Sequence, residues 1–192
     1  MTDTLIPLLV AVPLLGALLT IATGLLSERG PPAVTAVVLL VQTGLAGWIG
    51  SRAILNGPLS NEVGGFVAPY GIELVVDGLS AVVVTLVAAV SLAVLVYAVR
   101  DDPGGTAFYT EYLLLVTGLS GMSVTGDVFN LYVFLEISGL ATYALVASAG
   151  TGRSAVSALK YLLFGTVAAS LYLLGVGYAL VATGTLNMAD LA

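Results

Sequence analysis

Six long stretches of the sequence are almost free of charged residues, and each is long enough to cross a lipid bilayer as a helix. About 20 consecutive apolar residues span the hydrocarbon core, at about 1.5 Å of rise per residue. The predicted spans cover residues 5–26, 33–55, 74–99, 108–125, 128–148 and 155–183. We therefore predict an all-α, polytopic transmembrane helix bundle of about six helices, forming one domain over residues 1–192.

The composition supports a membrane location and excludes several functions. Hydrophobic residues make up 59% of the chain and charged residues 8%, whereas soluble domains carry about 25% charged residues. The chain has no Cys and no His, which excludes thiolate-ligated iron–sulfur clusters, His-ligated haem or zinc, and a Ser-His-Asp triad. A net charge of −6 leaves no basic patch for nucleic acid. We expect no cofactor, no metal and no nucleic-acid partner.

The positions of the arginines predict how the helices cross the membrane. Arg29, Arg100 and Arg153 fall in the first, third and fifth connections, which lie on one side, and Arg52 lies near the other side. Basic residues in short loops favour the cytoplasm. We expect a multi-pass protein of the cell membrane with both termini outside. The longest connection, residues 56–73, is expected to be an ordered loop outside the bilayer.

The residue that most constrains the function is Glu136, inside the predicted span 128–148. It follows Val128 by eight residues, which places it about 12 Å along the helix. An acid at that depth costs several kcal/mol unless it meets water or a partner. Such a carboxyl is suited to binding and releasing a proton, so we interpret Glu136 as a proton-translocation residue.

Polar residues flank Glu136 at helical spacing. Tyr132 and Tyr143 fall on the same stripe of the helix, and Ser138 and Thr142 form an adjacent stripe. Their hydroxyl groups are candidates for organising a short chain of water molecules along a proton pathway. The alternative is that the tyrosines pack and the smaller hydroxyls bond their own backbone.

Lys160 is the second ionisable group inside a predicted span. It lies about 7 Å from Ala155 along the last helix, close enough to the interface for its side chain to extend back to water. The other interpretation is that Lys160 faces Glu136 and modulates its proton binding, and we keep Lys160 as a candidate translocation residue.

The remaining acids have simpler interpretations. Asp77 and Asp127 each precede a predicted helix, where an Asp side chain accepts hydrogen bonds from helix N–H groups. Asp127 is also a candidate for the mouth of a proton pathway. Glu73 and Glu111 are interpreted as solvated loop charges.

Four segments resemble one known family. Residues 126–136, GDVFNLYVFLE, resemble the fifth-helix signature of the D subunit of Mrp-type sodium/proton antiporters. Residues 158–165 (ALKYLLFG) and 183–191 (TGTLNMADL) resemble the following part of that subunit, and residues 70–81 resemble the start of its third helix. Related subunits occur in NADH:quinone oxidoreductase and in membrane-bound hydrogenases.

The resemblance implies that Glu136 is the essential glutamate of a proton path and that Lys160 matches a lysine of some members. It implies as partners the lipid bilayer, H⁺, Na⁺ and the other subunits of a multisubunit antiporter. Members have about fourteen helices, so this chain corresponds to the N-terminal portion. Two alternatives stay open: a proton-pumping membrane-arm subunit of a redox-driven complex, without a redox centre of its own, and a non-conducting scaffold or half-subunit.

Overall fold

The computed structural model describes residues 3–66, 71–101 and 105–192, without the side chain of residue 101. Its six long helices are α1 (Leu8–Gly24), α2 (Gly30–Asn56), α3 (Gly78–Asp101), α4 (Gly105–Val124), α5 (Val128–Ala147) and α6 (Gly152–Thr183). The short elements are η1 (Asp3–Leu5), β1 (Leu59–Glu62), η2 (Val63–Gly65), β2 (Glu73–Val76) and α7 (Met188–Leu191).

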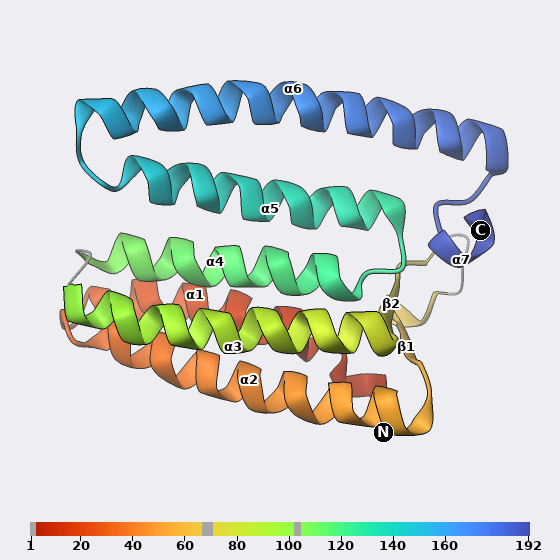
Figure 1. The fold of residues 1–192 in the computed structure, drawn as a ribbon, viewed down its shortest axis with the longest axis horizontal. Coiled ribbons are helices and arrows are strands. Elements are labelled where there is room, and N and C mark those ends of the chain that lie inside the picture. Colours follow the sequence, from red (N-terminus) through yellow and green to blue (C-terminus); the bar gives the residue numbers. More distant parts are fainter. Residues whose placement is uncertain (1–2, 67–70, 102–104) are drawn as a thin grey trace.

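The six long helices run antiparallel to their chain neighbours and form two groups (Figure 1). The first four pack together, with α4 against α1 and α3, while α5 packs on the other side of α4 and α6 packs on α5. Five of the long helices are long and apolar enough to cross a membrane, and α4 is not among them. The all-α membrane bundle is thus confirmed, with α4 as a more polar helix enclosed by the others.

The third predicted span is wrong at its start. Residues 73–76 form the strand β2, which pairs antiparallel with β1 in the register Leu59↔Val76 to Glu62↔Glu73. The helix α3 begins at Gly78 because Asp77 caps it, accepting a hydrogen bond from the Ser80 backbone N–H at 2.8 Å. The 56–73 connection therefore contributes to a small hairpin at one end of the bundle.

A buried glutamine compensates for the proline inside α1. Pro13 has no N–H to give to the carbonyl of Leu9, four residues earlier. The Gln42 side chain of α2 is fully buried, and its Nε2 donates to that carbonyl at 2.8 Å. The same nitrogen donates to Ser120 Oγ of α4 at 3.2 Å. One side chain thereby ties three helices together where α1 would otherwise leave a buried acceptor unpaired.

Two glycines let α4 and α5 approach closely. A Cβ on Gly118 would lie 2.7 Å from the backbone nitrogen of Ser138 and 2.8 Å from the carbonyl oxygen of Phe134. A Cβ on Gly121 would overlap the Phe134 ring. Small residues at such contacts are a common means of packing helices in lipid. The α4–α5 seam is the joint between the first four helices and the α5–α6 pair.

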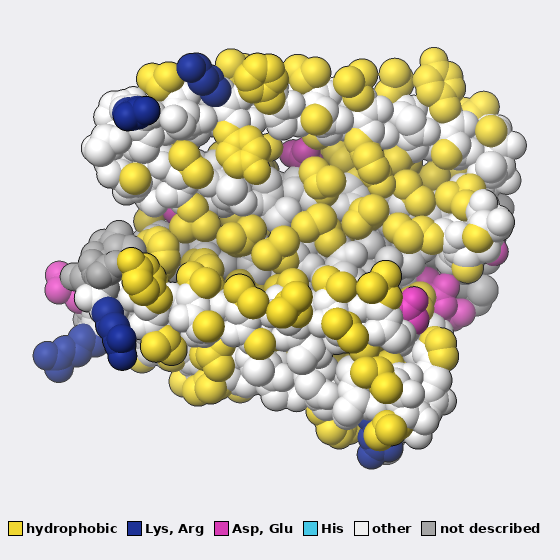
Figure 2. Space-filling model, in the orientation of Figure 1, with side chains coloured by type: hydrophobic (Ala, Val, Ile, Leu, Met, Phe, Trp, Pro, Cys, Tyr) yellow, Lys and Arg dark blue, Asp and Glu magenta, His cyan; other side chains and the backbone are white. Residues whose placement is uncertain are grey.

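Basic residues concentrate at the end of the bundle where the α1–α2, α3–α4 and α5–α6 connections lie, on the left in Figure 2. Arg29 precedes α2, Arg100 lies in the last turn of α3 and Arg153 in the first turn of α6. The chain termini and Arg52 lie toward the opposite end. This geometry fits the expected grouping of the connections, and the assignment of that end to the cytoplasm stays a prediction.

Candidate functional site

The segment before Glu136 is anchored by a buried cap. Asp127 is 7% exposed, and its Oδ1 accepts from the Asn130 backbone N–H at 2.7 Å. The Asn130 side chain donates to Thr125 Oγ1 at 3.0 Å, which closes the turn between α4 and α5. The structure therefore gives Asp127 the capping role. A second role at a pathway mouth stays a prediction.

Three segments far apart in the sequence meet at this turn. The Gly126 N–H donates to the Glu73 carbonyl at 2.8 Å, and the Val128 N–H donates to the Leu186 carbonyl at 2.9 Å. The Met188 N–H in turn donates to the Gly126 carbonyl at 2.8 Å. These bonds join β2, the start of α5 and the segment after α6, which are three of the segments that carry the family resemblance. They fix the entry of the helix that bears Glu136.

Glu73 is not simply a solvated loop charge. It lies in β2, and its Oε2 accepts a hydrogen bond from Asn187 Nδ2 at 3.0 Å. Asn187 is 4% exposed and also caps α7 through its Oδ1. The pair links the hairpin to the segment after α6, and sequence spacing could not reveal a contact across 114 positions.

Glu136 lies near the middle of α5 and is partly buried. Among the residues that the structure describes, it forms no ion pair and no hydrogen bond. The charge of Glu136 acts electrostatically on the hydroxyl of Tyr143, two turns further along the same helix. The structure thus places an acid without a countercharge at mid-helix, beside α6.

Tyr143 of α5 packs against a glycine and a tyrosine of α6. A Cβ on Gly165 of α6 would overlap the Tyr143 hydroxyl, and one on Gly139 would lie 3.2 Å from it. The Tyr143 ring also meets Tyr161 edge-on, with ring centroids 4.8 Å apart. Gly165 and Tyr161 are absent from the predicted site residues. The tyrosine-rich and glycine-rich spacing of both helices is the signal that could have found them.

A cavity of about 470 Å³ lies between α4, α5 and α6 beside Tyr143. The residues that line it include Leu115, Ser138, Thr142, Tyr143 and Tyr172. Two of the pathway candidates, Ser138 and Tyr143, therefore share one cavity. Tyr172 is a further residue that the sequence pattern did not single out, and it donates a hydrogen bond to a backbone carbonyl at the start of α5 at 3.1 Å.

The small hydroxyls of this cavity bond their own helix. Ser138 Oγ donates to the Leu135 carbonyl at 2.9 Å, and Thr142 Oγ1 donates to the Ser138 carbonyl at 2.7 Å. This is the backbone-bonding alternative considered for these residues. Their oxygens can still accept a hydrogen bond from water in the cavity.

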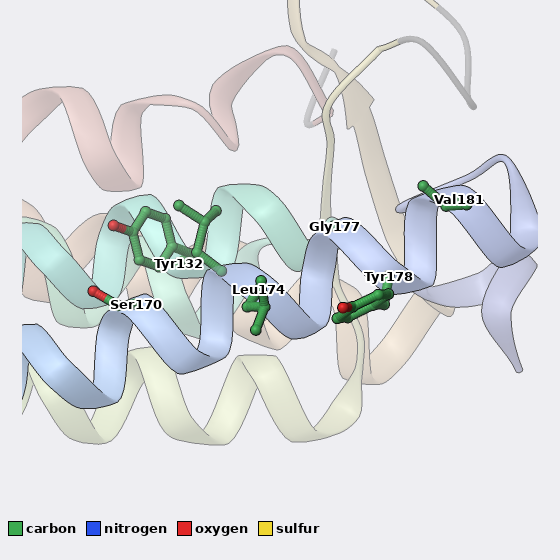
Figure 3. Close-up of a pocket in the computed structure, with 7 residues that line it drawn as sticks. Tyr132, Ser170, Leu174, Gly177, Tyr178 and Val181 are labelled. Atoms are coloured by element: carbon green, nitrogen blue, oxygen red, sulfur yellow. The ribbon is translucent and has the colours of Figure 1, made fainter.

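Tyr132 contributes to a different hollow. It lines an apolar groove of about 540 Å³ with Ser170, Leu174, Tyr178 and other residues of α6. Figure 3 shows these side chains along α6, with Tyr132 reaching them from α5. The Tyr132 ring stacks on Tyr172, with centroids 6.1 Å apart. The structure therefore does not bring Tyr132 and Ser138 to one cavity.

Lys160 is exposed and forms no ion pair among the described residues. The ring contacts Tyr143–Tyr161 and Tyr132–Tyr172 set the antiparallel register of α5 and α6. In that register Glu136 lies level with residue 168, so Lys160 lies about 12 Å away along the helix axis. The structure does not bring Lys160 to Glu136, and a role for Lys160 in translocation stays a prediction.

The interpretation of Glu111 as a solvated loop charge is wrong. Glu111 lies within α4, seven residues before Gly118, and is partly buried. Its Oε2 is inaccessible and has no hydrogen-bond partner. Glu111 falls inside the predicted span 108–125, and the sequence did not show that its side chain is enclosed, because that depends on which face of α4 meets the other helices.

Comparisons with known proteins agree on one family. The family model described as "NADH:quinone oxidoreductase/Mrp antiporter, TM" matches residues 125–192. The N subunit of NADH-quinone oxidoreductase from Desulforudis audaxviator is 46% identical over 193 residues, covering 98% of this chain and 37% of that relative. The D subunit of a Na(+)/H(+) antiporter from Bacillus subtilis is 36% identical over 151 residues, covering 77% and 31% respectively. The chain belongs to this family.

Solved structures show the same fold. A chain of the membrane-bound sulfane sulfur reductase, an archaeal respiratory membrane complex, matches with a TM-score of 0.90 at 32% identity, over 97% of this chain and 39% of that chain. A chain of the Mrp complex from Dietzia sp. matches with a TM-score of 0.89 at 27% identity, over 98% and 36% respectively. The protein is therefore a polytopic, antiporter-like membrane subunit, and it spans less than two-fifths of the length of these relatives.

Proposed function

We propose that this chain is part of the ion-translocating subunit of a multisubunit monovalent cation/proton antiporter in the cell membrane. Na⁺ is the proposed cation. Glu136 is the proposed proton-binding residue, and Lys160 is a candidate for modulating it. Other membrane subunits are the proposed partners.

The observation that carries the proposal is the position of Glu136. Its α-carbon lies about 12 Å from the start of a helix that is about 30 Å long, so neither end of the helix is near. The structure gives it no countercharge among the described residues. An acid in such a place is expensive, and intramembrane acids of this kind mark ion and proton pathways.

The exposed surface of α6 supports a multisubunit or longer assembly. Only 11% of the residues in an apolar 18-residue stretch of this helix are buried, and α6 packs mainly on α5. The groove beside Tyr132 opens on this surface. Since the relatives are more than twice as long, further helices of a subunit of that length are the proposed cover for this face.

The test is Glu136→Gln in the assembled complex, assayed in everted membrane vesicles as collapse of a preformed pH gradient on addition of Na⁺. We expect antiport to be lost, because an amide cannot exchange the proton. Glu62→Gln is the matched control, since Glu62 is exposed in β1 outside the spanning helices, and it should retain antiport. Full antiport in Glu136→Gln would reject the role.

A second candidate is a proton-pumping membrane-arm subunit of an NADH:quinone oxidoreductase. The 46% identity to the N subunit of such a complex, over 98% of this chain, favours it. The same vesicles separate the two: a redox-driven complex acidifies its lumen on addition of NADH and quinone, whereas an antiporter responds to Na⁺ alone. A chain that supports neither response, with Glu136→Gln equal to wild type, would be a scaffold.

A further inference from the structure

A second carboxyl inside the bundle, that of Glu111, is unexplained by the site around Glu136. It lies seven residues into α4, and its Oε2 has neither accessible surface nor a hydrogen-bond partner. A carboxyl oxygen that gives up water without gaining a partner costs free energy whether the group is charged or neutral, and far more when it is charged. Solvation at a loop therefore does not account for this residue.

The face of α4 that carries Glu111 is the face that meets α5. Gly118, which packs on the backbone of Ser138, is seven residues further along and so lies on the same stripe. Leu115, four residues from Glu111, lines the cavity between α4, α5 and α6. Glu111 thus lies about one helical turn from this cavity, on the side of the basic end of the bundle.

No cation on the packed helices neutralises Glu111. The helix α1 carries no charged residue, and the only charged residue of α5 is Glu136. The helix α2 carries Arg52 at the end away from the basic connections, and α3 carries Arg100 in its last turn. Among the described residues Glu111 forms no ion pair.

The other titratable groups on these faces are tyrosines. Tyr143 of α5 lines the cavity near Glu111 and interacts electrostatically with Glu136. Tyr161 of α6 lines the same cavity and contacts the Tyr143 ring. Tyr109 and Tyr112 lie on α4 itself, and the Tyr112 hydroxyl donates to the Ser91 carbonyl of α3 at 2.7 Å.

We propose that Glu111 is a second proton-binding carboxyl of the translocation path, which exchanges its proton with Glu136 through water that extends from the cavity beside Tyr143. Neither carboxyl lines this cavity, but Leu115, one turn from Glu111, and Leu135, the neighbour of Glu136, both do. The cavity of about 470 Å³ has room for several water molecules. Hydroxyl oxygens of Ser138, Thr142 and Tyr143 provide acceptors along it. One proton leaves the Glu111 carboxyl, passes through water, and arrives at the Glu136 carboxylate.

The inference rests on the proposed function, and its test separates the two. The variants are Glu111→Gln, Glu136→Gln and the matched control Glu28→Gln, which removes an exposed carboxyl at the same end of the bundle. Each is measured in the assembled complex, as antiport in vesicles and as the pH-dependent carbonyl stretch of protonated carboxyls in the infrared spectrum of the purified complex. Glu111→Gln should lower antiport about a hundredfold, as expected for loss of a proton-transfer group.

Glu111→Gln should also remove a pH-dependent carboxyl band that Glu136→Gln retains, while Glu28→Gln changes neither readout. Glu111→Asp, which keeps a carboxyl, should shift that band without removing it, and this variant replaces Glu111→Gln in the test if the amide variant does not assemble.

Normal antiport in Glu111→Gln with loss in Glu136→Gln would overturn this inference alone. Lost antiport with an unchanged infrared spectrum would also overturn it, because Glu111 would then act through packing. Normal antiport in both variants would overturn the proposed function.

Discussion

The first four helices and the α5–α6 pair differ in how they are held. In an apolar 18-residue stretch of each helix, 33%, 39% and 28% of the residues are buried in α1, α2 and α3, against 22% in α5 and 11% in α6. The first group contains the fully buried polar side chains Thr20, Thr35, Gln42, Thr117 and Ser120. The pair contacts the rest of the bundle mainly through the α4–α5 seam.

This difference indicates that the two regions have different tasks. The first four helices form a packed body whose polar groups are largely paired within it. The α5–α6 pair carries Glu136 and Lys160 on helices with much exposed surface, and the first group adds Glu111 on the face of α4 that meets α5. A change in the packed body should therefore reduce stability, and a similar change on the outer surface of α6 should not.

The largest effect is expected at the seam, for Gly118→Ala. The added methyl group would meet backbone atoms of Ser138 and Phe134 at under 3 Å, and the backbone cannot rotate away as a side chain could. We expect a loss of about 3 kcal/mol in the free energy of unfolding, at the upper end of the usual cost of overpacking. The measurement is SDS titration of the full chain in mixed micelles, followed by circular dichroism.

Gly175→Ala in α6 is the matched control, because nothing lies within 4 Å of a Cβ built there. It should be neutral or slightly stabilising, since alanine favours the helix over glycine. Equal losses in the free energy of unfolding at both positions would contradict the comparison between the two regions. Such a result would show that the helix glycines matter for a reason other than close approach of two helices.

An intermediate effect is expected for Gln42→Leu. The substitution leaves the buried Leu9 carbonyl without a donor, because Pro13 cannot supply one. The expected loss is about 1–2 kcal/mol by the same titration. The loss in free energy of unfolding should be smaller than for Gly118→Ala, because the substitution also removes Gln42 Oε1, a buried oxygen that has no hydrogen-bond partner.

The decisive variant for Gln42 is the double change Gln42→Leu with Pro13→Ala. The new N–H at residue 13 can bond the Leu9 carbonyl within α1, so most of the loss should be recovered. If the double variant is as unstable as Gln42→Leu, the glutamine stabilises the bundle through its contact with Ser120 and not through the proline-freed carbonyl.

Much of this fold was predictable because the composition of a segment largely determines whether it forms a membrane helix. Runs of apolar residues indicated all six long helices, and the arginines grouped their connections correctly at one end. The hairpin was missed because Leu74, Val75 and Val76 are as apolar as the helix that follows them. Only the cap at Asp77 marks where α3 begins, and a cap alone did not outweigh the hydropathy.

The candidate site was only partly predictable. Helical spacing correctly placed Tyr143 near Glu136 and Ser138 on a neighbouring face. It could not give the register between α5 and α6, which separates Lys160 from Glu136 and brings Tyr161 and Gly165 to Tyr143. Nor could it show that Glu111 is enclosed, since that depends on which face of α4 meets α5.

The smallest effect concerns the two helix caps, one in each region. Asp77 caps α3, and the hydrogen bond from the Ser80 backbone N–H holds the pKa of the Asp77 carboxyl below its usual value of 3.8. Thr151 caps α6 through its hydroxyl, which accepts from the Ser154 N–H at 3.0 Å and does not titrate. Because the folded pKa is lowered, the contribution of Asp77 is full above pH 4 and is lost as the pH falls through the folded pKa.

Asp77→Asn keeps the cap but removes the group that titrates. The difference in free energy of unfolding between this variant and the wild type should therefore shrink as the pH falls below about 4. We expect less than about 1 kcal/mol at neutral pH, because Asp77 is exposed and a cap of this kind contributes modestly. Thr151→Ala should cost about as much at pH 4 as at pH 7. The loss of stability caused by Thr151→Ala could instead fall with pH in parallel with the loss caused by Asp77→Asn. The acid sensitivity would then come from carboxyls elsewhere in the bundle and not from the α3 cap.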